Sequence, residues 1–308
     1  MSEIDKYPSR AGRKARLEPR VDPVVYALDP LELAAHLTPD QVAQYERDGF
    51  MILHDVFSVE EVRCFRDELD RMRRDVNLQG HDEAISEPDS GEIRSIFSVH
   101  NISPVFSRLA SDARLAGIAQ GLLNDGVYIH QSRLNYKPGF SGKEFYWHSD
   151  FETWHVEDGM PAMRALSMSI TLTENTQNNG PLMLMPGSHK HYAVCTGKTP
   201  ANHYLASLKK QEYGVPEADL LTKMAKQSGI VSALAKAGSV IIFDCNVMHG
   251  SNSNITPDPR SNVFFVYNAI SNRVAEPFCE QPPRPEYVSS RRHIERITPR
   301  QFDTGSYR

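Results

Sequence analysis

The sequence has few cysteines, and no two of them stand close together. The chain has four cysteines in 308 residues and no C-x-x-C pair. Zinc knuckles and disulfide frameworks depend on closely or regularly spaced cysteines. The pattern therefore favours reduced thiols in a cytoplasmic protein over disulfides. The four residues are Cys64, Cys195, Cys245 and Cys279.

Long apolar runs and an excess of basic residues are also missing. No apolar stretch approaches the roughly 20 residues that cross a bilayer, and the first residues lack the apolar core of a secretory signal. The net charge is −5, whereas proteins that grip nucleic acid electrostatically usually have a basic face. We therefore expect a cytoplasmic protein with neither a membrane nor a nucleic acid as partner.

Residues 1–30 are polar, and we interpret residues 1–37 as an N-terminal arm. A basic run of this kind usually lies in solvent, and packing on a partner subunit is the alternative. We expect residues 38–308 to form a single domain. The basic residues of the arm are Arg10, Arg13, Lys14, Arg16 and Arg20.

Two helices with a strand between them are predicted at the start of this domain. Thr38 supplies an N-cap hydroxyl, Pro39 stands at the first helical position and Gln41 stands at N3, which together begin a helix. Gly49 ends that helix, and residues 50–53 have the pattern of a short strand. A second capping box at 58–61 begins a helix whose apolar residues recur at helical spacing: Val62, Phe65, Leu69 and Met72.

From residue 127 onward the sequence predicts a β-rich region. Short apolar runs, at 182–185, 239–243 and 263–267, alternate with clusters of Gly, Pro, Asn and Asp, which is typical of a β-sandwich or barrel. Residues 201–236 interrupt this pattern with helical character, split at 214–216 and near Gly229. A lid over a site and a surface insertion explain the segment equally well.

One short motif has the composition of a metal site. His148-Ser149-Asp150 follows an aromatic run at 145–147. In a strand, residues i and i+2 point to the same face, so that His148 and Asp150 would reach one metal ion together. Chance H-x-D pairs are common, and a structural His–Asp pair is the alternative interpretation.

A third ligand is available far along the chain. Residues 238–244 predict a turn and a buried strand, and His249 follows just past the strand end. Two imidazoles and one carboxylate form the facial triad of non-haem iron(II) oxygenases, which leaves positions open for a co-substrate and dioxygen. We predict that His148, Asp150 and His249 bind iron(II) and form the catalytic centre.

A basic residue follows this third ligand. Arg260 precedes the predicted strand at 262–267. A guanidinium pairs bidentately with a carboxylate, so Arg260 is a candidate to hold the far carboxylate of 2-oxoglutarate, while the keto-acid end chelates iron. Lys137 competes for this role, and both residues can contact the co-substrate. The H-x-D motif, the distal His and the following Arg are together far more specific than any one of them.

The combined pattern resembles the phytanoyl-CoA dioxygenase superfamily over roughly residues 38–280. The similarity rests on the opening elements, the H-x-D motif, the turn from Asn179 to His189 and the spacing of His249 and Arg260. Within the superfamily, residues 131–140, 145–161 and 243–254 are similar to the members that hydroxylate ectoine. The resemblance implies a mainly β protein with flanking helices and a double-stranded β-helix (jelly-roll, cupin-like) core at about 127–275.

The resemblance also implies an activity and an assembly. It implies a cytoplasmic homodimer that hydroxylates ectoine to 5-hydroxyectoine with Fe(II), 2-oxoglutarate and O2, releasing succinate and CO2. A role for this compatible solute in the stress response follows from the product and not from the residues. Carried over position by position, 2-oxoglutarate would contact Asn135, Lys137, Ser251 and Arg260, and ectoine would contact Gln131, Thr153, Trp154, Ser167 and Phe264.

The chemistry of ectoine suits these residues. Ectoine is a small ring with a delocalised amidinium and a carboxylate, and an aromatic face attracts such a cation. Trp154 and Phe264 could supply this face, although both are also plausible core aromatics. Gln131 and the hydroxyls of Thr153 and Ser167 could bond the polar edge of the ring.

Several alternatives stay open from the sequence. A superfamily member acting on another small zwitterion would share all the metal and co-substrate residues. A non-catalytic metal-binding jelly roll, used as a sensor, would share the metal ligands but would not need Arg260 with Lys137. A halogenating enzyme is disfavoured because Asp150 occupies the position that a halide needs. We interpret three further histidines as structural and not as ligands: His155, His189 and His191.

Overall fold

The computed structural model describes residues 5–10, 12–27, 33, 35–75, 77–78, 80–86, 91–207 and 213–307. The predicted helix–strand–helix opening is confirmed. Helix α2 (Pro39–Asp48) has a capping box at Thr38 and ends at Gly49, whose φ of 81° is left-handed, a conformation that costs glycine little. Strand β2 (Phe50–Leu53) and helix α3 (Val59–Arg74) follow, and α3 also begins with a capping box.

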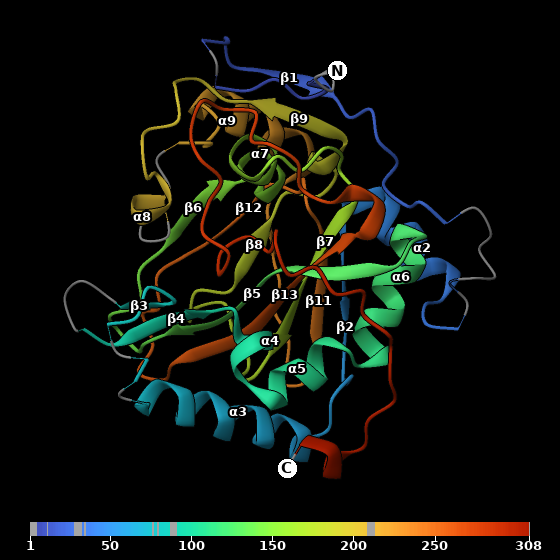
Figure 1. The fold of residues 1–308 in the computed structure, drawn as a ribbon, viewed down its shortest axis with the longest axis vertical. Helices are drawn as coiled ribbons and strands as arrows, with labels where there is room; N and C mark the ends of the chain where they lie inside the picture. Colours follow the sequence, from blue (N-terminus) through green and yellow to red (C-terminus); the bar gives the residue numbers. More distant parts are fainter. Residues whose placement is uncertain are drawn as a thin grey trace.

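Seven antiparallel strands form the larger sheet, in the order β2-β11-β7-β13-β5-β4-β3 (Figure 1). Its long strands are central and carry most of its buried residues. The strands besides β2 are β3 (Ala84–Ser86), β4 (Ile93–Phe97), β5 (Val127–Lys137), β7 (Ala165–Thr171), β11 (Val240–Asp244) and β13 (Arg260–Ala269).

One face of this sheet is apolar and packs against helices. Val263 and Phe265 of β13 belong to one buried cluster with Phe65 of α3 and Leu109 of α5. Because side chains alternate along a strand, the other residues of β13 face the opposite side of the sheet. The helical elements near this face, besides α3, are α4 (Val99–Ile102), α5 (Pro104–Ala110), the π-helical η1 (Ala113–Gly117) and α6 (Ile118–Leu123).

A smaller antiparallel sheet packs on that opposite side. Its order is β10-β8-β12-β6, and Leu182 and Leu184 of β8 share a buried cluster with Phe243 and Phe264 of the larger sheet. Two facing antiparallel sheets form a jelly roll, so the predicted fold class is confirmed. The strands are β6 (Phe145–His148), β8 (Leu182–Leu184), β10 (Val231–Ser232) and β12 (His249–Ser251).

The interpretation of the basic N-terminal run as a solvated arm is wrong for two of its arginines. Strand β1 (Arg16–Pro19) pairs with β9 (His191–Val194). Arg10 is only 1% exposed, and the Arg20 side chain is 3% exposed in an ion pair with Asp244. Buried carboxylates far along the chain hold these two guanidinium groups.

The remaining elements lie mainly at the end of the sandwich that carries β1 and β9 (Figure 1). In the expected helical insertion, α8 and α9 are helical, and residues 208–212 lie outside the described residues. The elements are α7 (Asp150–Thr153), the π-helical η2 (Trp154–Asp158), η3 (Ser188–Lys190), α8 (Tyr204–Ser207), α9 (Ala218–Ser228), η4 (Ile270–Asn272) and η5 (Thr304–Tyr307).

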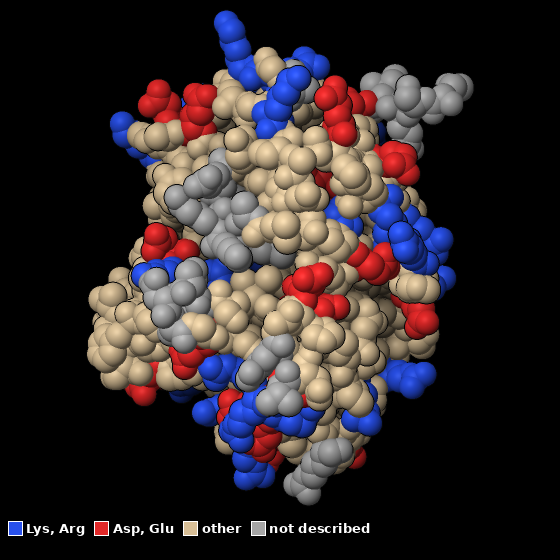
Figure 2. All heavy atoms as spheres, turned by 60° about the vertical axis from the view of Figure 1, so that its left-hand side comes forward, with Lys and Arg blue, Asp and Glu red and all other residues tan. Residues whose placement is uncertain are grey.

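Surface and thiol features are ordinary. All four cysteines are free thiols, as the sequence predicts. Among the described helices, none combines the length and the hydropathy that a membrane span requires. Figure 2 shows acidic and basic side chains interspersed over one face of the molecule.

Candidate active site

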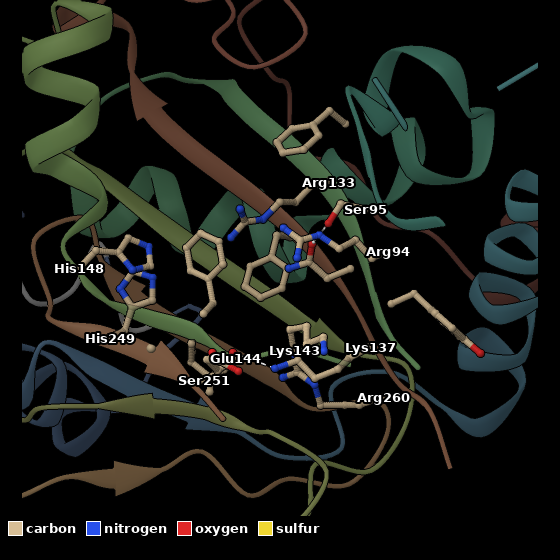
Figure 3. Close-up of a pocket in the computed structure, with 17 residues that line it drawn as sticks. Arg94, Ser95, Arg133, Lys137, Lys143, Glu144, His148, His249, Ser251 and Arg260 are labelled. Atoms are coloured by element: carbon tan, nitrogen blue, oxygen red, sulfur yellow. Dashed lines mark hydrogen bonds between the residues drawn. The ribbon is translucent and has the colours of Figure 1, made fainter. Parts of the chain in front are cut away.

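The inner face of the larger sheet carries polar side chains at alternating positions of β5. Gln131, Arg133, Asn135 and Lys137 stand two residues apart, so they share one face of the strand. Lys137 pairs with Arg260 across the strands, and Arg133 pairs with Phe264. Of these residues, all but Gln131 line one cavity between the sheets, and Figure 3 shows them around it.

The three predicted metal ligands meet at one side of this cavity. One ligand atom from each of His148, Asp150 and His249 can be chosen so that all three lie within 4.8 Å of one another. Asp150 is 3.5 Å from Nε2 of His148 and 3.8 Å from Nε2 of His249. Elsewhere in the described part of the chain, no other group of His, Cys, Asp and Glu meets this criterion.

The route by which His148 and Asp150 come together differs from the predicted one. Strand β6 ends at His148, and Asp150 is the first residue of the short helix α7. The strand alternation invoked for the pair is therefore wrong, because the chain turns into a helix between them. It is instead His249 that shares a sheet with His148, directly opposite it on β12.

Backbone carbonyls orient both imidazoles. Nδ1 of His148 lies 2.8 Å from the carbonyl oxygen of Tyr146, and Nδ1 of His249 lies 3.1 Å from that of Val247. A carbonyl only accepts hydrogen bonds, so each Nδ1 carries the proton and donates it. In the neutral tautomer, the lone pair of each ring is then on Nε2, the nitrogen on the side of Asp150, as a metal ligand requires.

The electrostatics of the cluster favour the same protonation states. Burial, with His148 beside it, lowers the pKa of His249 to about 4. Burial alone would raise the pKa of Asp150, but His249, His148 and Arg133 lower it well below its usual range. At neutral pH the cluster therefore offers a neutral imidazole of His249 and an ionised carboxylate, the donor set of a 2-His-1-carboxylate site.

Asn246 ties together the two turns that carry these ligands. Its Oδ1 accepts a hydrogen bond of 2.9 Å from Ser149, which stands between His148 and Asp150. Its Nδ2 donates to the carbonyl oxygens of His189 and His191, both at 2.9 Å. Asn246 carries no local signal in the sequence, because its partners are distant along the chain.

Two of the three additional histidines, His155 and His189, have structural contacts, in line with their interpretation. His155 hydrogen bonds through its two ring nitrogens to the Met160 carbonyl and to Asp5. Nε2 of His189 lies 3.3 Å from the carbonyl oxygen of Glu46. Both rings are therefore engaged by the scaffold.

The cavity beside the metal ligands is strongly basic. Arg260 is 5% exposed, and its Nε has no hydrogen-bond partner among the described residues. Burial lowers its pKa to about 10. On the adjacent strand, Nζ of Lys137 donates 3.0 Å to Oγ of Ser251. In Figure 3, Arg260 and Lys137 gather away from the two imidazoles, an arrangement that suits an anion reaching from the metal to Arg260.

Arg133 is the main residue that the sequence analysis missed. It is half-buried, and its Nε, which is itself buried, lacks a hydrogen-bond partner among the described residues. Its guanidinium carbon lies 5.0 Å from the centre of the Phe264 ring. Burial lowers the pKa of Arg133, and Asp150 partly opposes that shift. Gln131 and Asn135, its neighbours on the same face of β5, were both predicted to contact ligands. Their alternation with Arg133 was the signal that could have identified it.

The predicted substrate residues have different surroundings. Phe264 lines the cavity, whereas four others stand outside its lining. The hydroxyl of Ser167 lies 3.4 Å from Oδ2 of Asp150, and the amide of Gln131 donates to the Val288 carbonyl. Thr153 accepts a hydrogen bond from Arg10, and Trp154 packs edge-on against His130. Their roles toward a substrate stay predictions.

The jelly roll, the His-Asp-His cluster and the basic cavity define a mononuclear, non-haem metal oxygenase. A family model described as phytanoyl-CoA dioxygenase (PhyH) matches residues 45–262. The chain is 54% identical over 302 residues to the ectoine dioxygenase of Stutzerimonas stutzeri, covering 97% of this chain and 99% of the relative. The chain belongs to the phytanoyl-CoA dioxygenase family and, within it, to the ectoine dioxygenases.

Solved structures give the same result. EctD from S. alaskensis with 2-oxoglutarate and 5-hydroxyectoine has a TM-score of 0.87 at 48% identity, covering 98% of this chain and all of that one. The same enzyme with bound Fe has a TM-score of 0.85. The fold is thus similar to that of a structurally characterised enzyme.

Proposed function

We propose that the chain is an Fe(II)- and 2-oxoglutarate-dependent dioxygenase that hydroxylates ectoine to 5-hydroxyectoine. The observation that carries the proposal is the His148-Asp150-His249 cluster, whose two imidazoles line one cavity with Arg260, a buried guanidinium that has no carboxylate partner among the described residues. A metal site alone needs no such cation, whereas a site for a dicarboxylate does.

His148, Asp150 and His249 would hold the iron. The chemistry that iron supplies when bound is the activation of dioxygen, which oxidises 2-oxoglutarate to succinate and CO2 and inserts the second oxygen atom into a C–H bond of the substrate. The protein contributes the neutral Nε2 donors, the ionised carboxylate and a buried surrounding that limits access of water. The facial arrangement leaves coordination positions for the co-substrate and dioxygen.

Arg260 would bind the far carboxylate of 2-oxoglutarate, next to Lys137, Ser251 and Asn135. Arg260 and Lys137 are cross-strand partners on β13 and β5, so their cationic groups are presented to the same part of the cavity. Burial destabilises the positive charge of Arg260, and a carboxylate bound there would compensate that charge.

Arg133 and Phe264 would bind the two ends of a zwitterion. The guanidinium of Arg133 can pair with the ectoine carboxylate, and the face of Phe264 can attract the amidinium. The hydroxyl of Ser167 beside Asp150 and the amide of Gln131 on the face of Arg133 stand close to this region of the sheet. Trp154 and Thr153 would complete the site from α7 and η2.

The assembly and cellular role are proposed from the resemblance noted in the sequence. We infer a cytoplasmic homodimer whose product serves as a compatible solute in the stress response. A hydroxylase for another small zwitterion would keep the same metal and co-substrate residues and change only the substrate contacts. A non-catalytic metal sensor is the alternative of another class, and the Arg260 cavity argues against it.

Product analysis tests the function. The protein is loaded with Fe(II) without oxygen, mixed with 2-oxoglutarate and ectoine, and then exposed to air. Succinate and hydroxyectoine are expected in equal amounts by mass spectrometry, with both lost in Asp150→Ala. Succinate without hydroxyectoine would reject ectoine as the substrate, and the absence of succinate from folded, iron-loaded protein would reject the dioxygenase.

A further inference from the structure

Arg10 reaches from the N-terminal segment into the scaffold of the active site. Its Nε donates 3.0 Å to Oε1 of Glu152, and its Nη2 donates 2.6 Å to Oε2 of the same carboxylate. Nη2 also lies 3.4 Å from the hydroxyl of Thr153. The pair is fully enclosed, with side-chain exposures of 2% for Arg10 and 1% for Glu152.

Glu152 and Thr153 belong to the same short helix as Asp150. Helix α7 spans Asp150–Thr153 and makes no side-chain cap hydrogen bond at its N-terminus. A four-residue helix has little stability of its own, because a single turn barely offsets the cost of nucleation. Its orientation therefore depends on tertiary contacts. The rigid, planar guanidinium of Arg10 supplies one by binding the carboxylate of Glu152 bidentately.

The same guanidinium also binds η2, which follows α7, and the segment around Thr199. Nη1 of Arg10 donates to Oε1 of Glu157 in η2 and, at 3.1 Å, to the hydroxyl of Thr199. His203 lies 2.8 Å from Oε1 of Glu157. Burial alone would lower the pKa of Arg10, but Glu152 and Glu157 raise it well above its usual range, so the guanidinium stays charged and paired.

Three features show that this contact is built into the fold. The backbone nitrogen of Arg10 donates 2.9 Å to the carbonyl of Cys195, and Ser9 donates 2.7 Å to Glu152. The backbone at Gly214 also lies close to Arg10 and Glu152, because a Cβ at that position would collide with both side chains. In Figure 1 the N-terminal strand, β9 and α7 lie together at one end of the sandwich.

We propose that Arg10 is a positioning residue for the hydroxylation, which fixes the turn from Asp150 to Trp154 relative to the cavity. The inference rests on the proposed function and adds to it a residue from outside the region 45–262 that the family model covers. Arg10 does not line the cavity. It acts through Glu152 and Thr153, and so determines how accurately the target C–H bond is held.

The proposal predicts a selective kinetic effect. Arg10→Lys keeps the charge but loses the bidentate fork, so the turn at 150–154 shifts. Because displacements of about 1 Å can cost up to about 100-fold in rate, we expect the KM for ectoine to rise roughly tenfold and the ratio of hydroxyectoine to succinate to fall well below one. The KM for 2-oxoglutarate should change little at saturating iron, because Arg260 and Lys137 are held by β13 and β5.

Two matched variants separate positioning from a loss of stability. Arg114→Lys alters another arginine with two carboxylate partners, Asp112 and Glu61, in the helical layer. Arg16→Lys alters a half-exposed arginine of the same N-terminal segment. Both should leave the product ratio unchanged. Glu152→Gln weakens the Arg10 pair from its other side and should give the same uncoupling as Arg10→Lys, which covers the case in which one variant folds poorly.

Amide hydrogen exchange of the metal-free protein supplies a readout that does not depend on activity. Faster exchange is expected in peptides covering 149–160 in Arg10→Lys, with α3 unchanged. Coupled turnover and wild-type exchange in both Arg10→Lys and Glu152→Gln would overturn the proposal. If the wild-type protein itself forms no hydroxyectoine, the proposed function fails first, and the exchange result still reports on the Arg10 contact.

Discussion

Replacing Arg260 by methionine should raise the stability of the metal-free protein while weakening its affinity for 2-oxoglutarate. Arg260 is buried in β13, and burial lowers its pKa from 12.5 to about 10. A base whose pKa is lowered by folding is less stable in its charged form in the folded chain than in the unfolded chain. The shift corresponds to a penalty of about 3 kcal/mol at neutral pH. Methionine fills a similar length without charge, so the free energy of unfolding should rise by up to that amount.

Binding of the co-substrate should change in the opposite direction. Removing one partner of a buried, hydrogen-bonded charge pair costs at least about 2 kcal/mol, which is roughly a 30-fold or larger increase in Kd. The two effects would have a common cause, since Arg260 has no carboxylate partner among the described residues and the proposed 2-oxoglutarate would supply one.

Urea unfolding of the metal-free protein and oxygen-free calorimetry of 2-oxoglutarate binding with Fe(II) measure the two effects. Arg114→Met is the control, because Arg114 already pairs with Asp112 and Glu61, so its loss should destabilise the fold and spare binding. Wild-type affinity for 2-oxoglutarate in Arg260→Met would refute the assignment of this residue. A stability loss equal to that of Arg114→Met would refute the charge argument.

Three other predictions follow from the same geometry. Arg133→Leu should raise the KM for ectoine roughly 30-fold or more in steady-state assays, because it removes the side chain proposed to pair with the ectoine carboxylate. The KM for 2-oxoglutarate should change little. Asn246→Ala should weaken iron binding by about 10- to 100-fold in a chelator competition, because it frees Ser149 between two ligands. Burial would raise the pKa of Asp158, but Arg284 and His130 lower it to about 2. Asp158 should therefore contribute about 2 kcal/mol of stability above pH 4, lost as the pH falls from about 4 to 2. Urea unfolding measured as a function of pH checks this prediction. If Asp158→Asn loses the same amount of stability as the pH falls from about 4 to 2, the prediction is wrong.

Local signals in the sequence predicted the parts of the fold that depend on local chemistry. Thr38 and Gln41 form a capping box, a motif that depends only on residues close in sequence, and α2 begins there. The ligand residues were found because H-x-D, His249 and Arg260 form a pattern of residue types. Their burial in one cavity then follows from the pairing of β6 with β12 and of β5 with β13.

Contacts between distant residues were not accessible in the same way. The burial of Arg10 depends on Glu152, a partner on another element, and a basic run by itself indicates only solvent. The prediction placed Asp150 in the same strand as His148. His148 does lie in β6, but the chain turns into α7 after Ser149, so Asp150 is helical. The role of Arg133 needed the cavity, because nothing in the sequence shows that its guanidinium lacks a carboxylate partner.

Isotope labelling of the products tests the central claim most directly. The reaction is run with ¹⁸O₂ in ordinary water, and succinate and hydroxyectoine are analysed by mass spectrometry. If the cavity is that of an Fe(II)/2-oxoglutarate dioxygenase acting on ectoine, one atom of label enters succinate and the other enters the new hydroxyl, with the products in equal amounts. Unlabelled succinate, or a hydroxyl whose oxygen comes only from water, would contradict the account.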